Sequence, residues 1–129
     1  MAVVGGSSPV STEVVAEKAG MVCKKIVIAD DGVWTYDFGE NMYSAAIIIS
    51  TNDGSPFING IFGIRAATTD FATPIASNNI SVSSGALTGT TGVDGELTLS
   101  CHTDHKVYIE NRLGSNKSLL VTIMWGIEE

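Results

Sequence analysis

The clearest pattern in the sequence is an alternation of apolar and polar positions along short stretches. In VWTYDF, Trp34, Tyr36 and Phe38 fall on one side of an extended chain, while Thr35 and Asp37 fall on the other. A period of two residues is typical of a strand with one buried face. This stretch is therefore predicted to be a β-strand whose aromatic side faces the core.

Runs of β-branched and aromatic residues recur along the chain from about Val22 onward, and residues at helical spacing are almost absent there. Together these runs predict about eight strands, a number that suits an all-β, antiparallel β-sandwich or jelly roll. The predicted strands cover residues 24–29, 33–38, 43–50, 57–67, 79–84, 96–102, 106–112 and 118–125.

Clusters of Gly, Asp, Asn and Ser separate the predicted strands. The triplets DDG (30–32), NDG (52–54) and VDG (93–95) place glycine where a chain reversal requires a positive φ. GSNKS (114–118) is predicted to be the hairpin loop before the last strand. The segment 84–95 is rich in Gly, Ser and Thr and poor in apolar residues, so we expect an exposed connection.

The first twenty residues follow a different pattern. Ser8 as a cap, Pro9 at the first helical position and Gly20 at the end favour a short helix, and a strand or an extended arm fits almost as well. The length of 129 residues suits one domain. We therefore divide the chain into an N-terminal arm or stalk connection, residues 1–20, and one β-sandwich domain, residues 21–129.

Composition limits the partners that we expect. Fourteen acidic and seven basic residues give a net charge of −7, and the largest basic cluster is Lys24 with Lys25. Nucleic acid and anionic membrane surfaces would therefore not attract the chain. Only 16% of residues are charged and 44% are hydrophobic, a thin polar coat for a small domain. We expect other subunits to cover part of the apolar surface.

No apolar run approaches the roughly 18 residues that a membrane-spanning helix needs, so we expect no membrane insertion. The N-terminus lacks the basic start and long apolar centre of a secretory signal. The expectation is a soluble protein that is synthesised in the cytoplasm.

The stretch SCHTDH (100–105) holds both histidines and one of the two cysteines. Alternation in ELTLSCH directs Cys101 to the interior, where a thiol behaves as a small hydrophobe and not as a nucleophile. We expect Cys101 and Cys23 to be reduced. No CxxC, HxxxH or facial set of carboxylates supports a metal site at His102 or His105, and TDHK (103–106) is predicted to be a hairpin turn.

Catalytic signatures are also missing from the sequence. Ser100, His102 and Asp104 alternate along one strand end, so their side chains run parallel and do not point at one another as a triad requires. No GxSxG, P-loop or dinucleotide fingerprint is present. We therefore expect no catalytic residue, no metal, no cofactor and no enzyme activity.

Carbohydrate recognition combines aromatic faces with Asn, Asp and Arg side chains held by a rigid sandwich. Tyr108 alternates with Val107 and Ile109, so it should face outward beside Glu110. An inter-subunit contact or a cross-strand pair is the alternative role for Tyr108. The candidate carbohydrate-binding residues are Tyr43, Tyr108, Asn111, Arg112 and Trp125.

Several of these segments resemble a known family. The order of a Gly/Thr/Ser loop, DGELTLS, a short polar turn, KVYIENRLGS and a closing apolar strand is similar to the C-terminal β-sandwich domain of bacteriophage tailspikes and tail fibres. The earlier IVIADDGVWTYDFGENMYSAAIIIST resembles the start of such domains. The resemblance covers about Ile26 to Trp125, and its best element is YIENRLGS, Tyr108 to Ser115.

The resemblance implies a homotrimeric component of the virion tail that closes the distal end of a fibre and binds bacterial surface polysaccharide. Polysaccharide cleavage does not follow, because the chain has no β-helix repeat and no catalytic Gly-Asp-Ser block. One alternative is a purely structural trimer cap without a ligand. Another is a lectin or adhesin module that binds carbohydrate as a monomer.

Overall fold

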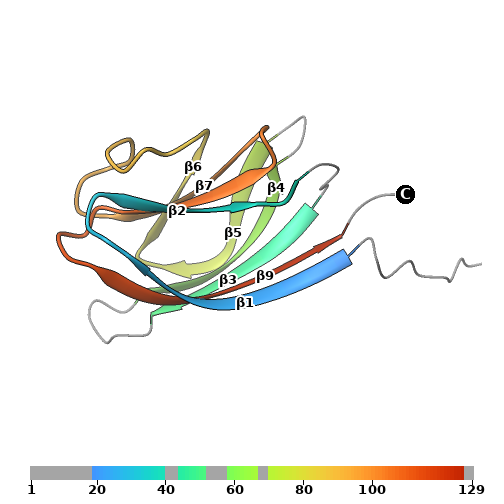
Figure 1. Cartoon of the computed structure of the whole chain (residues 1–129), viewed down its shortest axis with the longest axis horizontal. Coiled ribbons are helices and arrows are strands. Elements are labelled where there is room, and N and C mark those ends of the chain that lie inside the picture. The colour runs from blue at the N-terminus through green and yellow to red at the C-terminus, as the bar shows by residue number, and fades with distance from the viewer. Residues whose placement is uncertain (1–18, 40–43, 52–57, 67–69, 127–129) are drawn as a thin grey trace, which may run out of the picture.

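Two β-sheets pack face to face in the computed structural model, which describes residues 19–39, 44–51, 58–66 and 70–126. Figure 1 shows the layer that contains β2, β6 and β7 lying over the layer that contains β1, β3 and β9. Every regular element in these ranges is a strand, so the predicted all-β sandwich is confirmed. The described ranges contain no helix of the length and apolarity that crossing a membrane requires.

The five-stranded sheet has the order β1-β9-β3-β4-β5, and all its described neighbours are antiparallel. Its first and last strands in the chain, β1 and β9, lie side by side along their whole lengths. The strands of this sheet are β1 (Ala19–Ile28), β9 (Lys117–Gly126), β3 (Ser44–Thr51), β4 (Asn59–Ala66) and β5 (Asp70–Asn78).

The four-stranded sheet has the order β2-β8-β7-β6. β8 pairs in antiparallel fashion with both β2 and β7, whereas β6 runs parallel to β7. A parallel neighbour requires a connection that crosses back along the sheet, so the chain between β6 and β7 has to return over the sandwich. The strands of this sheet are β2 (Gly32–Asp37), β8 (Lys106–Asn111), β7 (Leu97–His102) and β6 (Ile80–Ser84).

The core lies between the two sheets and is built from the inward positions of alternating strands. On β8, Val107 and Ile109 are fully buried, and on β9 the inward positions Leu119, Val121 and Ile123 are at most 1% exposed. The remaining fully buried apolar side chains come from both sheets and from the residue before β4: Ile47, Ile49, Ile58, Phe62, Leu97, Leu99 and Cys101.

The sequence prediction missed β5. This strand contains Pro74 and lies at the edge of the five-stranded sheet, where a missing N–H breaks no ladder on its open side. A register shift between Ile61 and Phe62 on the neighbouring β4 accompanies it. Because its side chains lack a clear period of two, this strand had no signal that distinguished it from a loop.

The first strand starts earlier than the sequence pattern indicated. β1 begins at Ala19, and Gly20 lies within it opposite Trp125, so Gly20 does not end a helix here. A Cβ atom on Gly20 would overlap the indole of Trp125. This close packing explains why a glycine stands inside the strand. The predicted arm over residues 1–18 lies outside the described residues.

Two of the predicted turns show where glycine is needed. Gly95 (φ 90°) of VDG has the predicted positive φ, and Gly114 (φ 97°) in the loop before β9 has one too. In DDG the positive φ falls on Asp31 (φ 60°) and not on the glycine. Gly32 is required for a different reason, because a Cβ atom there would come within 2.9 Å of the Ala29 carbonyl oxygen. The NDG triplet lies outside the described residues.

An aromatic cluster closes one end of the sandwich beside β2. Trp34, Tyr36 and Phe38 share the inward side of that strand, as predicted, and all three are half-buried. The ring of Trp125 from β9 lies 5.9 Å from Tyr36 and 5.6 Å from Phe38 between centroids. We call Tyr36, Phe38 and Trp125 the aromatic edge.

Replacing Trp125 by alanine should lower the free energy of unfolding by about 3 kcal/mol, the lower end for large aromatic truncations, because the indole is only half-buried. Urea denaturation measures the change. The control is Thr35→Ala on the exposed side of β2, which should stay within about 0.5 kcal/mol of wild type. Equal effects of the two changes would contradict the packing role of Trp125.

Candidate functional site

The outer side of the four-stranded sheet is covered by another segment of the chain. Its sequence alternates between apolar and polar residues, which is typical of a sheet with one exposed side. Tyr108 and Glu110 point away from the core, as the sequence predicted, yet they are only 8% and 1% exposed. The chain between β6 and β7, residues 85–96, runs along this side and covers it (Figure 1). We call it the covering loop. The predicted exposed connection is therefore partly buried, with Leu87 only 5% exposed.

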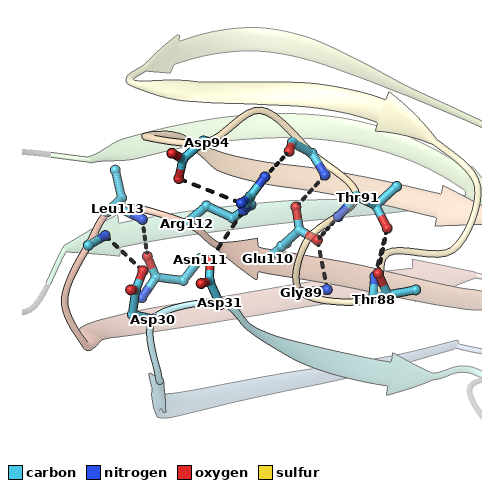
Figure 2. Close-up of polar contacts among 12 residues, drawn as sticks. Asp30, Asp31, Thr88, Gly89, Thr91, Asp94, Glu110, Asn111, Arg112 and Leu113 are labelled. Atoms are coloured by element: carbon cyan, nitrogen blue, oxygen red, sulfur yellow. Dashed lines mark hydrogen bonds and ion pairs between the residues drawn. The ribbon is translucent and has the colours of Figure 1, made fainter.

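Glu110 holds the covering loop in place. Its Oε2 accepts hydrogen bonds from the backbone N–H groups of Gly89 (2.8 Å) and Thr91 (3.1 Å), and Oε1 accepts one from Gly92 N (2.7 Å) (Figure 2). All three partners are donors, which matches a carboxylate that can only accept. Hydrogen bonds to a charged group contribute about 1.5–3 kcal/mol each, so this buried acid fixes the loop backbone.

The sequence of the loop allows this close approach because two positions are glycine. Gly89 has a positive φ of 109°, and a Cβ atom there would overlap the Asp31 carbonyl oxygen. A Cβ atom on Gly92 would come within 2.8 Å of Thr98 Oγ1 and would also crowd the Glu110 carboxylate. The segment GTTG is therefore shaped to wrap a carboxylate with its backbone.

Arg112 fastens the other side of the same loop. Its Nη1 donates to the Gly92 carbonyl oxygen (2.8 Å), and its Nε donates to Asp31 Oδ1 (3.2 Å) in the turn between β1 and β2. Nη2 lies 3.6 Å from Asp94 Oδ1. Figure 2 shows the guanidinium lying between these groups. Arg112 thus joins the covering loop to the start of β2.

Asn111 ties down the loop before β9. Its side-chain Nδ2 donates to the carbonyl oxygens of Ile28 (2.9 Å) and Ser115 (2.8 Å), while Oδ1 accepts from Leu113 N (2.9 Å). Asp30 accepts from Gly114 N (2.8 Å) in the same region. The YIENRLGS segment is therefore a set of internal braces that connect three loops.

A cleft of about 310 Å³ opens beside these braces. The side chains of Asn79, Ser81 and Glu96 supply hydrogen-bonding groups, and Ile80 and Leu113 supply apolar surface. The Ser81 hydroxyl donates to Glu96 Oε1 (2.5 Å). The backbone of Glu96 is held on both sides, since its carbonyl oxygen accepts from Arg112 N (3.0 Å) and its N–H donates to Val93 O (3.2 Å). Hydrogen bonds with Asn111 and Arg112 therefore hold one side of the cleft, formed by Gly95, Glu96 and Leu113.

Sequence reasoning missed most of this cleft. Asn79 adopts a positive φ of 64°, a conformation in which asparagine is enriched, so NNIS carried a turn signal. The approach of Glu96 and Leu113 to Asn79 depends on the parallel pairing of β6 with β7, for which the sequence held no signal.

Tyr108 lies at the opposite end of β8. Its hydroxyl donates to Asp104 Oδ2 (2.5 Å), which also explains the position of Asp104 in the turn before β8. Burial raises the pKa of the Tyr108 phenol to about 12, and the hydrogen bond to Asp104 and the charges of Asp104 and Asp37 act in the same direction. The phenol therefore remains a hydrogen-bond donor at neutral pH.

The predicted carbohydrate-binding residues do not converge on one site. Asn111 and Arg112 lie at the start of β2, where Gly32 pairs with Asn111, whereas Trp125 packs on the last residues of β2. Six residues of strand, about 17–20 Å, separate these ends. Tyr43 lies outside the described residues.

The SCHTDH stretch has the predicted local structure. Cys101 is fully buried, and its Sγ donates to the Arg65 carbonyl oxygen (3.2 Å). Residues 103–105 form the hairpin turn between β7 and β8, in which His105 has a φ of 66°. Cys23 is exposed on the other sheet, and neither cysteine forms a disulfide. Within the described ranges, no three His, Cys, Asp or Glu side chains are grouped to hold a metal ion.

Comparisons with known proteins give one structural likeness to report. No family model and no curated protein matches the chain. The crystal structure of the Acinetobacter phage vB_ApiP_P1 tailspike protein is similar over 98% of this chain, with a TM-score of 0.39 and 7% sequence identity. The chain spans about a quarter of that protein, 25% of its length.

Glu110→Gln should destabilise the fold by about 1–3 kcal/mol, because one acceptor oxygen becomes an NH₂ group that faces a backbone donor. Hydrogen exchange of the Gly89, Thr91 and Gly92 amides should become faster than in wild type.

The matched control is Asp94→Asn, since Asp94 is 84% exposed and its ion pair with Arg112 is long. That change should stay within about 0.5 kcal/mol of wild type. Unchanged loop exchange in Glu110→Gln would show that other contacts hold the loop.

The Tyr108 phenol should ionise near pH 12 in the folded protein, against about 10 when unfolded. A raised pKa favours the protonated folded state, so this stabilisation is complete below pH 10 and is lost as the pH rises through 12. The measurement is the tyrosinate absorbance of wild type minus that of Tyr108→Phe. A difference curve with its midpoint near 10 would contradict the buried donor role.

Proposed function

We propose that the chain is a non-catalytic C-terminal module of a phage tailspike or tail fibre, which forms a homotrimer and binds glycans on the host surface. The resemblance of residues 26–125 to that family and the β-sandwich fold support the proposal. The observation that carries the binding role is the cleft beside Glu96, where the backbone of Arg112 holds Gly95 and Glu96 through two hydrogen bonds.

A fixed cleft suits sugar recognition because little conformational entropy is lost when a ligand binds. Asn79 and Glu96 offer the amide and carboxylate groups that hydrogen-bond to hydroxyls, and Ile80 and Leu113 offer apolar surface for the ring faces. One such site would bind weakly. Three copies on a trimer gain affinity for a repeating surface polysaccharide through multivalency.

Chemistry at the cleft favours binding over hydrolysis. Glycosidases use two carboxyl groups on either side of the scissile bond, and Glu96 is the one carboxylate among the described residues that line the cleft. Its Oε1 is occupied by the Ser81 hydroxyl. The cleft is therefore proposed to bind glycans without cleaving them. As part of the same proposal, the module is a receptor-binding part of the virion tail and is synthesised in the host cytoplasm.

The test is binding of the purified chain to bacterial surface polysaccharides and a glycan array, with two cleft variants. Asn79→Gly removes the amide and keeps the positive φ, and Glu96→Gln keeps the shape and removes the charge. Each variant should weaken binding about tenfold or more, as the loss of a hydrogen bond to a polar ligand does. Ser83→Ala, exposed on β6, is the control and should bind as wild type does.

Two outcomes would overturn parts of this function. Absence of binding to any glycan by a trimeric wild-type protein would favour the structural cap. A solution mass of one 13.5 kDa chain, in place of three, would contradict the trimer and favour the monomeric lectin or adhesin module.

A further inference from the structure

The outer face of the five-stranded sheet is unusually apolar for a surface that meets water. Six large hydrophobic side chains of this sheet are between 39% and 70% exposed. They come from β1, β4, β5 and β9, and they are Met21, Val27, Ile61, Ile75, Leu120 and Met124. An exposed apolar area of this kind marks an interaction surface.

Strand register makes these side chains contiguous. Thr122 on β9 stands between Cys23 on β1 and Ile48 on β3, and Ile48 stands opposite Ile61 on β4. The next outward position on β9, Met124, pairs with Met21. We call this surface, which also includes Lys25 and Leu120, the bare face.

A hollow of about 410 Å³ lies on the bare face. Ile48 and Ile61 form its apolar part, and Ser50, Asn59 and Ser77 form its polar part. A hollow of this volume in an exposed sheet gives a partner side chain a place to insert.

The bare face is also large enough for a stable contact. Five strands about 4.8 Å apart and roughly eight residues long, at about 3.3 Å per residue, give a face of about 600 Å² in projection. Stable interfaces bury about 800 Å² of accessible surface per partner, which a side-chain-covered face of this size can supply.

Charge separates this face from the rest of the molecule. The outward positions of β1, β3, β4 and β9 contain two basic residues, Lys25 and Arg65, and no acidic residue. Lys24 lies on the other side of β1, and Lys117 is only 3% exposed. The acidic residues of the described ranges, except Asp70 at the start of β5, lie instead in the four-stranded sheet and its connections. In a chain with a net charge of −7, the bare face is where a second copy meets the least repulsion.

The aromatic edge supplies a complementary surface. Tyr36, Phe38 and Trp125 are half-buried there. Asp37 and Asp104 lie beside it, exposed, and both are close enough to Tyr108 to raise its pKa. They accept hydrogen bonds from uncharged donors, and Lys106 stands opposite Asp37 on β8. Two carboxylates beside one lysine leave a net negative charge for a basic partner.

We propose that the bare face of one copy docks on the aromatic edge of the next, with Lys25 directed toward Asp37 and Asp104. This arrangement rests on the proposed homotrimer and specifies how its copies meet. A three-fold ring requires a heterologous contact, in which two different surfaces of the same chain meet. The bare face and the aromatic edge are apolar surfaces with opposite charges, as such a contact demands.

Cys23 reports directly on this arrangement because it lies on the bare face and is exposed in the single chain. Assembly should bury it. Alkylation of the intact native protein with a maleimide, located by peptide mass spectrometry, should modify Cys23 about tenfold or more slowly in the oligomer than in dissociated chains. Cys101 is buried in the core of every folded chain and reports unfolding.

Two bare-face variants test the contact itself. Leu120→Asp and Lys25→Glu should each raise the dissociation constant of the oligomer roughly tenfold or more and should expose Cys23. The effect of Lys25→Glu should be larger at low salt. The control is Val93→Asp, a 62% exposed residue of the covering loop, which should assemble as wild type does. Retained protection of Cys101 shows that each variant is folded.

The outcomes separate this contact from the proposed function. A trimer in which Cys23 reacts as fast as in dissociated chains would overturn the bare-face contact and leave the trimer standing. A wild-type monomer would overturn both. The proposed contact is supported by a trimer that protects Cys23, that both bare-face variants weaken and that Val93→Asp leaves unchanged.

Discussion

The buried carboxylate of Glu110 is the interaction on which the outer side of the four-stranded sheet depends. An ionised group that is 1% exposed needs full hydrogen bonding, and the backbone of the covering loop supplies it through Gly89, Thr91 and Gly92. The loop is in turn ordered by the carboxylate, because GTTG has little apolar surface of its own. Neither part would be stable in this position without the other.

The braces also hold one side of the cleft proposed to bind glycans. Arg112 and Asn111 lie next to Glu110 on the same strand end, and their side chains hold the covering loop, the turn before β2 and the loop before β9. The cleft at Asn79 and Glu96 lies where these held segments meet β6. Asn111 and Arg112, which the sequence suggested as sugar ligands, thus hold loops in place through their side chains.

The outer side of the four-stranded sheet is covered, whereas that of the five-stranded sheet is exposed. The connections between the strands explain this difference. The parallel pair β6–β7 requires a long return, and that return covers the four-stranded sheet. The described strands of the five-stranded sheet are antiparallel, so no return of that kind is needed and the bare face keeps its apolar side chains in contact with solvent. This asymmetry underlies the contact proposed between copies.

The sequence by itself determined the strands other than β5, and which side of an alternating strand faces the core, because a period of two is a local property. It placed Cys101, Val107 and Ile109 correctly for that reason. Only the tertiary structure decided that Tyr108 and Glu110, on the opposite side, are buried as well. That outcome depends on the path of a loop from another part of the chain, and no local period records which segments a loop will cover.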